Sequence, residues 1–239
     1  MLNRRVITID IETLPVNEPI EHLLTEKDKS NEQKAQEVYR KTALNGDFGR
    51  ILCIGYCDEK PDGSRKMGFL GWDKEKDCLH ADEGSILEEF WTMMREFNPN
   101  GDRLVGHNIF DFDLRFIIKR SIINRVRPTV ELSFARYRSQ PVFDTMCEWD
   151  CWSFGNRVSL DKLAFALSLP TSKSEEVNGS RIFDLYQAGR HKEIRDYCLQ
   201  DVRLTRQIYK LMTFTTDEDL YSEKQNFSTL ASLEVEQVQ

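Results

Sequence analysis

The chain has 239 residues, of which 40% are hydrophobic and 31% are charged, and its formal net charge is −7. This composition suits one sizeable core, and no apolar run reaches the ~18 residues that a membrane-spanning helix needs. It therefore argues against a membrane protein, and we expect a soluble, cytoplasmic one. The six cysteines form no Cys-x-x-Cys pair, which favours reduced thiols over a zinc or redox site.

In the N-terminal half, alternating apolar residues bounded by turn signals predict strands, and apolar residues three or four apart predict helices. The turn signal Pro61-Asp-Gly63 predicts that the second and third strands form a hairpin. The elements expected here are strands at 4–11, 50–56, 66–71 and 103–106, a helix at 82–97, and a charged helical insertion at about 16–49.

The C-terminal half is mostly helical in pattern. After a helix that begins near Phe112, the expected elements are a strand at 141–145 and helices at 160–169, 179–188 and 191–212. This order predicts an α/β fold with a mixed five-stranded sheet, three strands antiparallel and two parallel, flanked by helices. We expect one domain over 1–214.

Charge is unevenly distributed along the chain. Seven basic residues and one acidic residue lie between Arg115 and Arg138. Such a run is by default a solvated face, but it could also contact phosphates in a salt-sensitive way. Residues 215–239 hold six acidic residues and one lysine, which is typical of a loosely held acidic tail.

Asp10 and Glu12 lie two residues apart in the first predicted strand, so their side chains share one face of it. Ile7, Ile9 and Ile11 face the other way. Two crowded carboxylates repel each other unless a cation lies between them, and a divalent metal is the usual solution. The pattern therefore predicts a metal site at the end of this strand.

Two further regions carry acids that could join this site. Asp111 and Asp113 follow the fourth strand, and the residues alone leave both open as ligands. Tyr197 and Asp201 are four residues apart in the last helix and so lie on one face. Converging carboxylates can hold two divalent ions about 3.5–4 Å apart, and such oxygen-rich ligation points to Mg²⁺ or Mn²⁺.

The order and spacing of these segments resemble the three exonuclease motifs of the DEDD superfamily of 3′→5′ exonucleases. The tyrosine is typical of the tyrosine subclass, and the second segment is most similar to the proofreading domain of family B DNA polymerases. Because the chain is too short to contain a polymerase, it resembles the stand-alone exonucleases related to that domain. The matching segments are Ile9-Asp-Ile-Glu-Thr13, Gly106-His-Asn-Ile-Phe-Asp-Phe-Asp113 and Tyr197-Cys-Leu-Gln-Asp201.

The resemblance implies a ribonuclease-H-like fold and assigns roles to individual residues. Asn108 and Phe112 match the polymerase-like motif in a way that places the ligand at Asp113, which leaves Asp111 as an N-cap or first-turn acid. Tyr197 would position the attacking water. The acids implied to bind metal are Asp10, Glu12, Asp113 and Asp201.

The resemblance also implies substrate contacts. Glu12 would touch the 3′-terminal nucleotide, and Thr13 belongs to the same motif. Asn108 and Phe112 would contact that nucleotide, unless they only pack and cap the turn. Lys162 would lie near a phosphate, although its segment also reads as structural.

The function implied is hydrolysis of terminal phosphodiesters in single-stranded DNA, with two Mg²⁺ or Mn²⁺ ions and release of nucleoside 5′-monophosphates. Single-stranded DNA with a 3′ end, or RNA, would be the partner, with a replication or repair protein as a further candidate. Two alternatives stay open. One is an RNA-trimming 3′→5′ exoribonuclease, because ribonuclease D belongs to the tyrosine subclass, and the other is a catalytically silent nucleic-acid-binding module.

Overall fold

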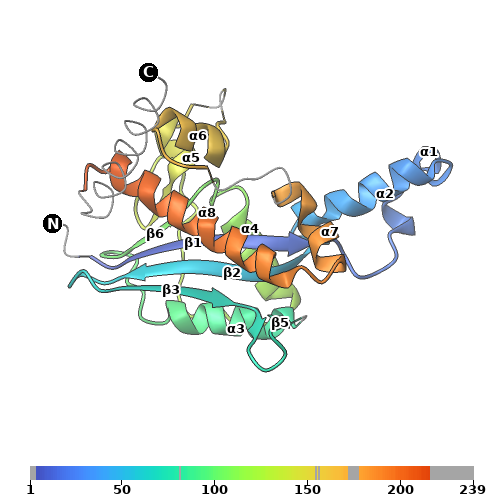
Figure 1. The fold of residues 1–239 in the computed structure, drawn as a ribbon, viewed down its shortest axis with the longest axis horizontal. Helices are drawn as coiled ribbons and strands as arrows, with labels where there is room; N and C mark the ends of the chain where they lie inside the picture. Colours follow the sequence, from blue (N-terminus) through green and yellow to red (C-terminus); the bar gives the residue numbers. More distant parts are fainter. Residues whose placement is uncertain (1–3, 81, 154, 156, 172–177, 216–239) are drawn as a thin grey trace, which may run out of the picture.

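A computed structural model of the chain describes residues 4–80, 82–153, 155, 157–171 and 178–215. Five strands form one mixed sheet in the order β3-β2-β1-β6-β7 (Figure 1). β1 pairs antiparallel with β2 and parallel with β6, so it occupies the centre of the sheet. The strands are β1 (Val6–Leu14), β2 (Arg50–Glu59), β3 (Arg65–Leu70), β6 (Arg103–Gly106) and β7 (Val142–Asp144). The predicted sheet, its two strand directions and the hairpin of the second and third strands are confirmed.

Helices cover both faces of this sheet. Ile7, Ile9 and Ile11 of β1 are buried in the largest apolar cluster, under α3 (Glu83–Met94) and α4 (Asp113–Ile123). On the opposite face, α8 (His191–Met212) crosses the sheet over β1 and β2 (Figure 1). Because side chains alternate along a strand, Asp10 and Glu12 point to the α8 side.

Smaller elements complete the fold. α6 (Leu160–Ala166) packs on α8 through a buried apolar cluster, and α5 (Thr145–Trp149) follows β7 directly. The predicted insertion forms short helices that extend away from the sheet (Figure 1). They are η1 (Glu21–Leu23), α1 (Glu26–Lys29), α2 (Glu32–Lys41) and η2 (Thr42–Leu44).

Several local predictions differ from the structure. The helix predicted to reach residue 169 ends at Ala166, and the helix predicted from Gly179 begins as a 3-10 turn, η3 (Gly179–Arg181), before α7 (Ile182–Gln187). α5 and the two-stranded ribbon of β4 (Trp72–Asp73) and β5 (Cys78–Leu79) were not predicted, because elements this short show no periodicity. Most of the predicted acidic tail, residues 216–239, lies outside the described residues. In the described part of the chain, no helix has the length and apolar character needed to cross a membrane.

Candidate active site

The two acids of β1 lie side by side at the face covered by α8. The pairing of β1 with β2 is interrupted between Glu12 and Thr13, which marks a β-bulge directly after the acids. Glu12 is buried, and the Oδ2 atom of Asp10 is buried without a hydrogen-bond partner among the described residues. A buried carboxylate oxygen without a partner is costly, so this site is suited to a cation.

The third acid, Asp113, is the first residue of α4 and is 4% exposed. Its Oδ1 accepts a hydrogen bond from the backbone N–H of Ile11 at 3.2 Å, which places it against β1 between the two strand acids. The loop before α4 is fixed by Asp144, whose carboxylate accepts from the backbone N–H groups of Asn108 (2.9 Å) and Phe110 (3.1 Å). The end of β7 therefore holds the loop that delivers Asp113.

Tyr197 and Asp201 come from α8, one turn apart, and both are buried. The tyrosine hydroxyl is hydrogen-bonded to the Asp201 carboxylate. α8 comes this close because Gly55 lies beneath it on β2: a Cβ at Gly55 would lie 2.8 Å from the Cys198 Sγ atom. Glycine at this position thus sets the depth at which the helix acids meet those of β1.

The carboxylates of this cluster raise one another's pKa values through their negative charges. Burial raises the pKa of Asp10 well above its ordinary value, and the charges of Asp201 and Asp113 raise it further. Burial likewise raises the pKa of Glu12, with Asp10 as the next contributor. Burial is also the main cause that raises the pKa of Asp113 to about 7. Four mutually repelling acids at one place are a donor set for divalent cations.

Burial, together with the negative charge of Asp201, raises the pKa of Tyr197 far above its ordinary value. The phenol therefore stays protonated at neutral pH. Such a hydroxyl can donate to Asp201 and still accept a hydrogen bond from water, which is a positioning role.

A cysteine is also part of this cluster. Ligand atoms of Asp10, Glu12 and Cys198 all lie within 4.8 Å of one another. The Cys198 thiol donates to the backbone oxygen of Asp10 at 3.6 Å, and burial raises its pKa well above the ordinary value. The thiol is thus a neutral neighbour of the acids. The sequence predicts only a reduced thiol at Cys198, because a single cysteine next to Tyr197 matches no metal-binding or redox motif.

A pocket of about 350 Å³ lies next to Glu12. One wall comes from the helical insertion, which is attached to α7 by an ion pair in which Arg40 binds Asp184 at 2.5 and 3.2 Å. Arg40 also lies over the Phe183 ring. Sequence reasoning missed this wall, since its contacts join residues 144 positions apart. Residues lining the pocket include Glu12, Thr13, Arg40, Leu44, Phe112, Ser180 and Phe183.

The predicted substrate contacts divide between this pocket and other places. Thr13 and Phe112 line the pocket, although the Thr13 hydroxyl donates to the Ala43 backbone oxygen and so ties β1 to η2. Asn108 has a left-handed backbone (φ 61°), and its Oδ1 is buried without a partner among the described residues. Lys162 is exposed on α6 and does not line the pocket.

Asp111 does not have the expected role. The N-cap of α4 is Phe112, and the Asp111 carboxylate lies among the arginines 115, 136 and 157. Asp111 therefore neither caps α4 nor joins the acid cluster at β1.

Comparison with known proteins identifies the fold and the family of the chain. No curated protein matches the chain. Among solved structures, the chain is similar to the family B DNA polymerase from the hyperthermophilic archaeon Pyrobaculum calidifontis, with a TM-score of 0.57 and 16% identity over 88% of this chain. The match spans 24% of the polymerase chain, and at this identity it shows the fold alone, which is ribonuclease-H-like.

A family model described as a predicted 3′-5′ exonuclease related to the exonuclease domain of PolB matches residues 44–236. The match begins after β1, so Asp10 and Glu12 lie outside the matched segment. The fold nevertheless brings both acids into the site. It covers well over half of the chain. The chain therefore belongs to this family of 3′→5′ exonucleases related to the PolB exonuclease domain.

Proposed function

We propose that this exonuclease removes nucleoside 5′-monophosphates from the 3′ end of single-stranded DNA, with two divalent cations held by its acid cluster. The observation that carries the proposal is the hydrogen bond from Ile11 N–H to Asp113 at 3.2 Å, because it seats the third acid against Asp10 and Glu12. Asp201 reaches the same place from α8 and raises the pKa of Asp10.

The donor set suits hard divalent cations. Asp10, Glu12, Asp113 and Asp201 offer carboxylate oxygens, and the buried Oδ2 of Asp10 has no other partner among the described residues. Mg²⁺ and Mn²⁺ prefer such oxygen ligands, and we propose these four acids as their holders. When bound, two such ions would activate a water and neutralise charge on the phosphate.

The side chains of this site would then orient the reaction. Tyr197 would hold the attacking water by accepting its hydrogen bond, while its own proton is donated to Asp201. The water gives up one proton as its oxygen forms a bond to phosphorus, and the bond from phosphorus to the 3′-oxygen of the preceding nucleotide breaks. That oxygen takes up a proton, so the products are a nucleoside 5′-monophosphate and a strand with a new 3′-hydroxyl.

The pocket beside Glu12 is the proposed seat of the terminal nucleoside. Its volume of about 350 Å³ is at the small end of ligand sites and fits one nucleoside better than a base pair. Phe112 offers a ring to stack on the base, and Thr13 lies at the same wall. A frayed single-stranded end would therefore enter more readily than a duplex end.

The test uses 5′-labelled DNA and RNA single strands of one sequence, with Mn²⁺, with Mg²⁺ or with a chelator. We expect stepwise shortening of the DNA that depends on metal and is lost in Asp10→Ala and Asp201→Ala. Asp196→Ala is the matched control, because Asp196 is an exposed acid on the same helix. Faster shortening of the RNA would establish the exoribonuclease alternative, and binding without any shortening would establish the silent module.

A further inference from the structure

We propose that a surface beside the acid cluster binds the single strand upstream of the terminal nucleotide, a role that rests on the proposed function. We call it the arginine–aromatic surface. Three arginines would contact the phosphates, and the exposed rings of Phe134 and Tyr137 would stack on the bases, while the half-buried Trp152 supports Tyr137. The surface consists of Arg115, Arg136, Arg157, Phe134, Tyr137 and Trp152.

Three arginines from separate segments converge on one carboxylate. Asp111 lies 3.2 Å from Arg115, 2.6 Å from Arg136 and 2.5 Å from Arg157. Asp150 lines the same hollow as Arg136 and Arg157, so two negative charges against three positive charges leave a local excess of positive charge. Each guanidinium has five N–H donors, whereas Asp111 has only two oxygens, so donors remain for a second anion. The three side chains are 54%, 32% and 52% exposed, which makes those donors accessible.

A series of aromatic rings runs from the second acidic motif to this surface. Phe110 is buried and contacts Trp152 at 5.6 Å between ring centroids, and Trp152 contacts Tyr137 at 5.4 Å. Tyr137 is 61% exposed, and Phe134, three residues earlier, is 41% exposed. Large rings exposed next to arginines match the composition of surfaces that bind single-stranded nucleic acid without sequence preference.

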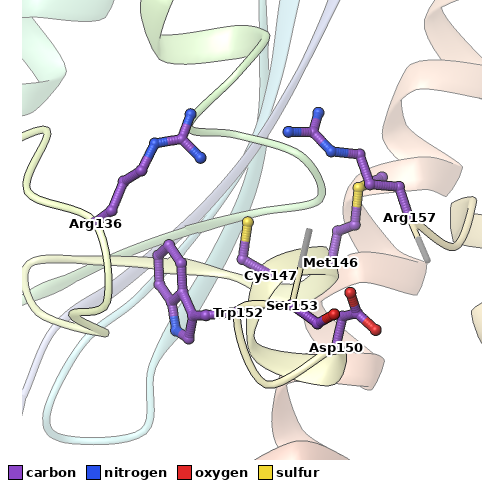
Figure 2. Close-up of a pocket in the computed structure, with 7 residues that line it drawn as sticks. All are labelled: Arg136, Met146, Cys147, Asp150, Trp152, Ser153 and Arg157. Atoms are coloured by element: carbon purple, nitrogen blue, oxygen red, sulfur yellow. The ribbon is translucent and has the colours of Figure 1, made fainter. Parts of the chain in front are cut away.

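Figure 2 shows how Arg136, Arg157 and Trp152 lie relative to one another. Arg136 and Arg157 extend from opposite sides, and Trp152 lies below Arg136 in the same hollow. The hollow has a volume of about 20 Å³, which holds a water and excludes a base. A strand would therefore lie across the surface, with its phosphates between the two arginines.

The backbone of this surface is held in an uncommon conformation. Tyr137 (φ 63°), Cys151 (φ 48°) and Trp152 (φ 60°) are all in the left-handed region. Bulky residues rarely adopt it, and they keep it only where the surrounding contacts impose it. This agrees with rings that are positioned in advance for a ligand.

The surface is close to the acid cluster along the chain. Asp111 and Asp113 are two residues apart, a separation that spans at most about 7 Å of backbone. A strand whose terminal phosphate reaches the Asp113 carboxylate would therefore bring its next phosphates near the arginines.

The first experiment measures binding of a labelled 12-nucleotide DNA single strand in chelator, where no hydrolysis occurs. We expect Tyr137→Ala, Phe134→Ala and Arg157→Gln each to weaken binding at least about fivefold, as for loss of one stacked base or one phosphate contact. Arg157→Gln should also make binding less dependent on salt. The controls are Arg65→Gln, at the start of the edge strand opposite β7, and Phe214→Ala, a ring 95% exposed after α8.

The second experiment compares hydrolysis of the 12-nucleotide strand with hydrolysis of the p-nitrophenyl ester of thymidine 5′-monophosphate, which has no upstream strand. We expect the surface variants to lower the ratio of the two kcat/KM values about fivefold or more, and the controls to leave it unchanged. Binding and ratio equal to wild type in all three surface variants would overturn the surface. If wild type binds the strand through this surface but hydrolyses neither substrate, the proposed function fails and the surface stands.

Discussion

The Asp113 carboxylate accepts a hydrogen bond from the backbone N–H of Ile11, with 3.2 Å between Oδ1 and N. This contact joins the start of α4 to the middle of β1, although the residues are 102 positions apart. The carboxylate of Asp111, only two residues earlier, instead forms ion pairs with Arg136 and Arg157. Two neighbouring aspartates thus have different partners, and their substitution should have different effects.

Asp113→Asn should weaken Mn²⁺ binding roughly 10- to 100-fold, because it removes one charge from a shared set of oxygen ligands. Asp111→Asn should leave Mn²⁺ affinity within about twofold, since its carboxylate contacts arginines. Isothermal titration with Mn²⁺ measures both. Equal losses in the two variants would contradict the assignment of the metal ligand to Asp113.

The metal should stabilise the protein more at pH 8 than at pH 6. In the folded protein without metal, burial raises the pKa of Asp113 to about 7, against 3.8 for the ordinary group. Between these values the unfolded chain loses its proton first, so the metal-free fold loses stability as the pH rises toward 7. A divalent ion needs the ionised carboxylate and displaces the proton at pH 6, which weakens its binding there.

Thermal unfolding with and without Mn²⁺ measures this difference. At about 100 times the Kd, bound metal contributes about 2.7 kcal/mol, which is roughly 5–10 °C for a domain of this size. The increase in Tm should be smaller at pH 6, and Asp113→Asn should reduce this dependence on pH. An increase of equal size at both pH values would contradict the coupling.

Tyr197→Phe should lower kcat about 10- to 100-fold and leave Mn²⁺ affinity unchanged, because it removes only the hydroxyl that would hold the water. Steady-state kinetics on the single strand, together with Mn²⁺ titration, separate these effects. Tyr209→Phe is a matched control on the same helix, where the hydroxyl accepts a hydrogen bond from Arg103 at 3.3 Å. An unchanged kcat in Tyr197→Phe would remove the tyrosine from the mechanism.

The sequence predicted the sheet and the long helices well, because β1 and α8 carry long periodic patterns. It did not predict the pocket wall, since the Arg40–Asp184 pair joins two polar segments far apart in the chain. The sequence also predicts one basic face for the run between Arg115 and Arg138, either solvated or in contact with phosphates. In the structure Arg120 is used internally, in a part-buried ion pair with Glu83, and Lys119 pairs with Asp47.

The arginine–aromatic surface illustrates the same limit. Two of its arginines, Arg115 and Arg136, belong to the basic run, but Arg157 does not. Their shared partner, Asp111, was predicted to be an N-cap or first-turn acid, because the only local feature of the sequence there is its position before a helix. Contacts between distant segments decide such cases, and no periodicity in the sequence encodes them.

The Arg40–Asp184 ion pair should affect substrate binding more than chemistry. Arg40→Gln should raise KM for the single strand a few-fold and leave kcat within about twofold, because an exposed pair contributes at most about 1 kcal/mol to holding α2. Lys29→Gln is the control, since it breaks an exposed pair on α1 away from the pocket. A loss of kcat without a change in KM would show that this wall does not hold the nucleoside.

Gly55→Ala links packing to chemistry. The added Cβ would lie 2.8 Å from the Cys198 Sγ atom and 3.1 Å from a Val202 methyl carbon, so α8 must move away from the sheet. That movement should cost about 1–3 kcal/mol of stability and also weaken Mn²⁺ binding, because Asp201 moves with the helix. Gly155→Ala is the control, since its nearest contact would be an ordinary 3.9 Å. Thermal unfolding and Mn²⁺ titration measure the two effects, and a loss of stability with unchanged metal affinity would mean that Asp201 is not held in place by the depth of α8.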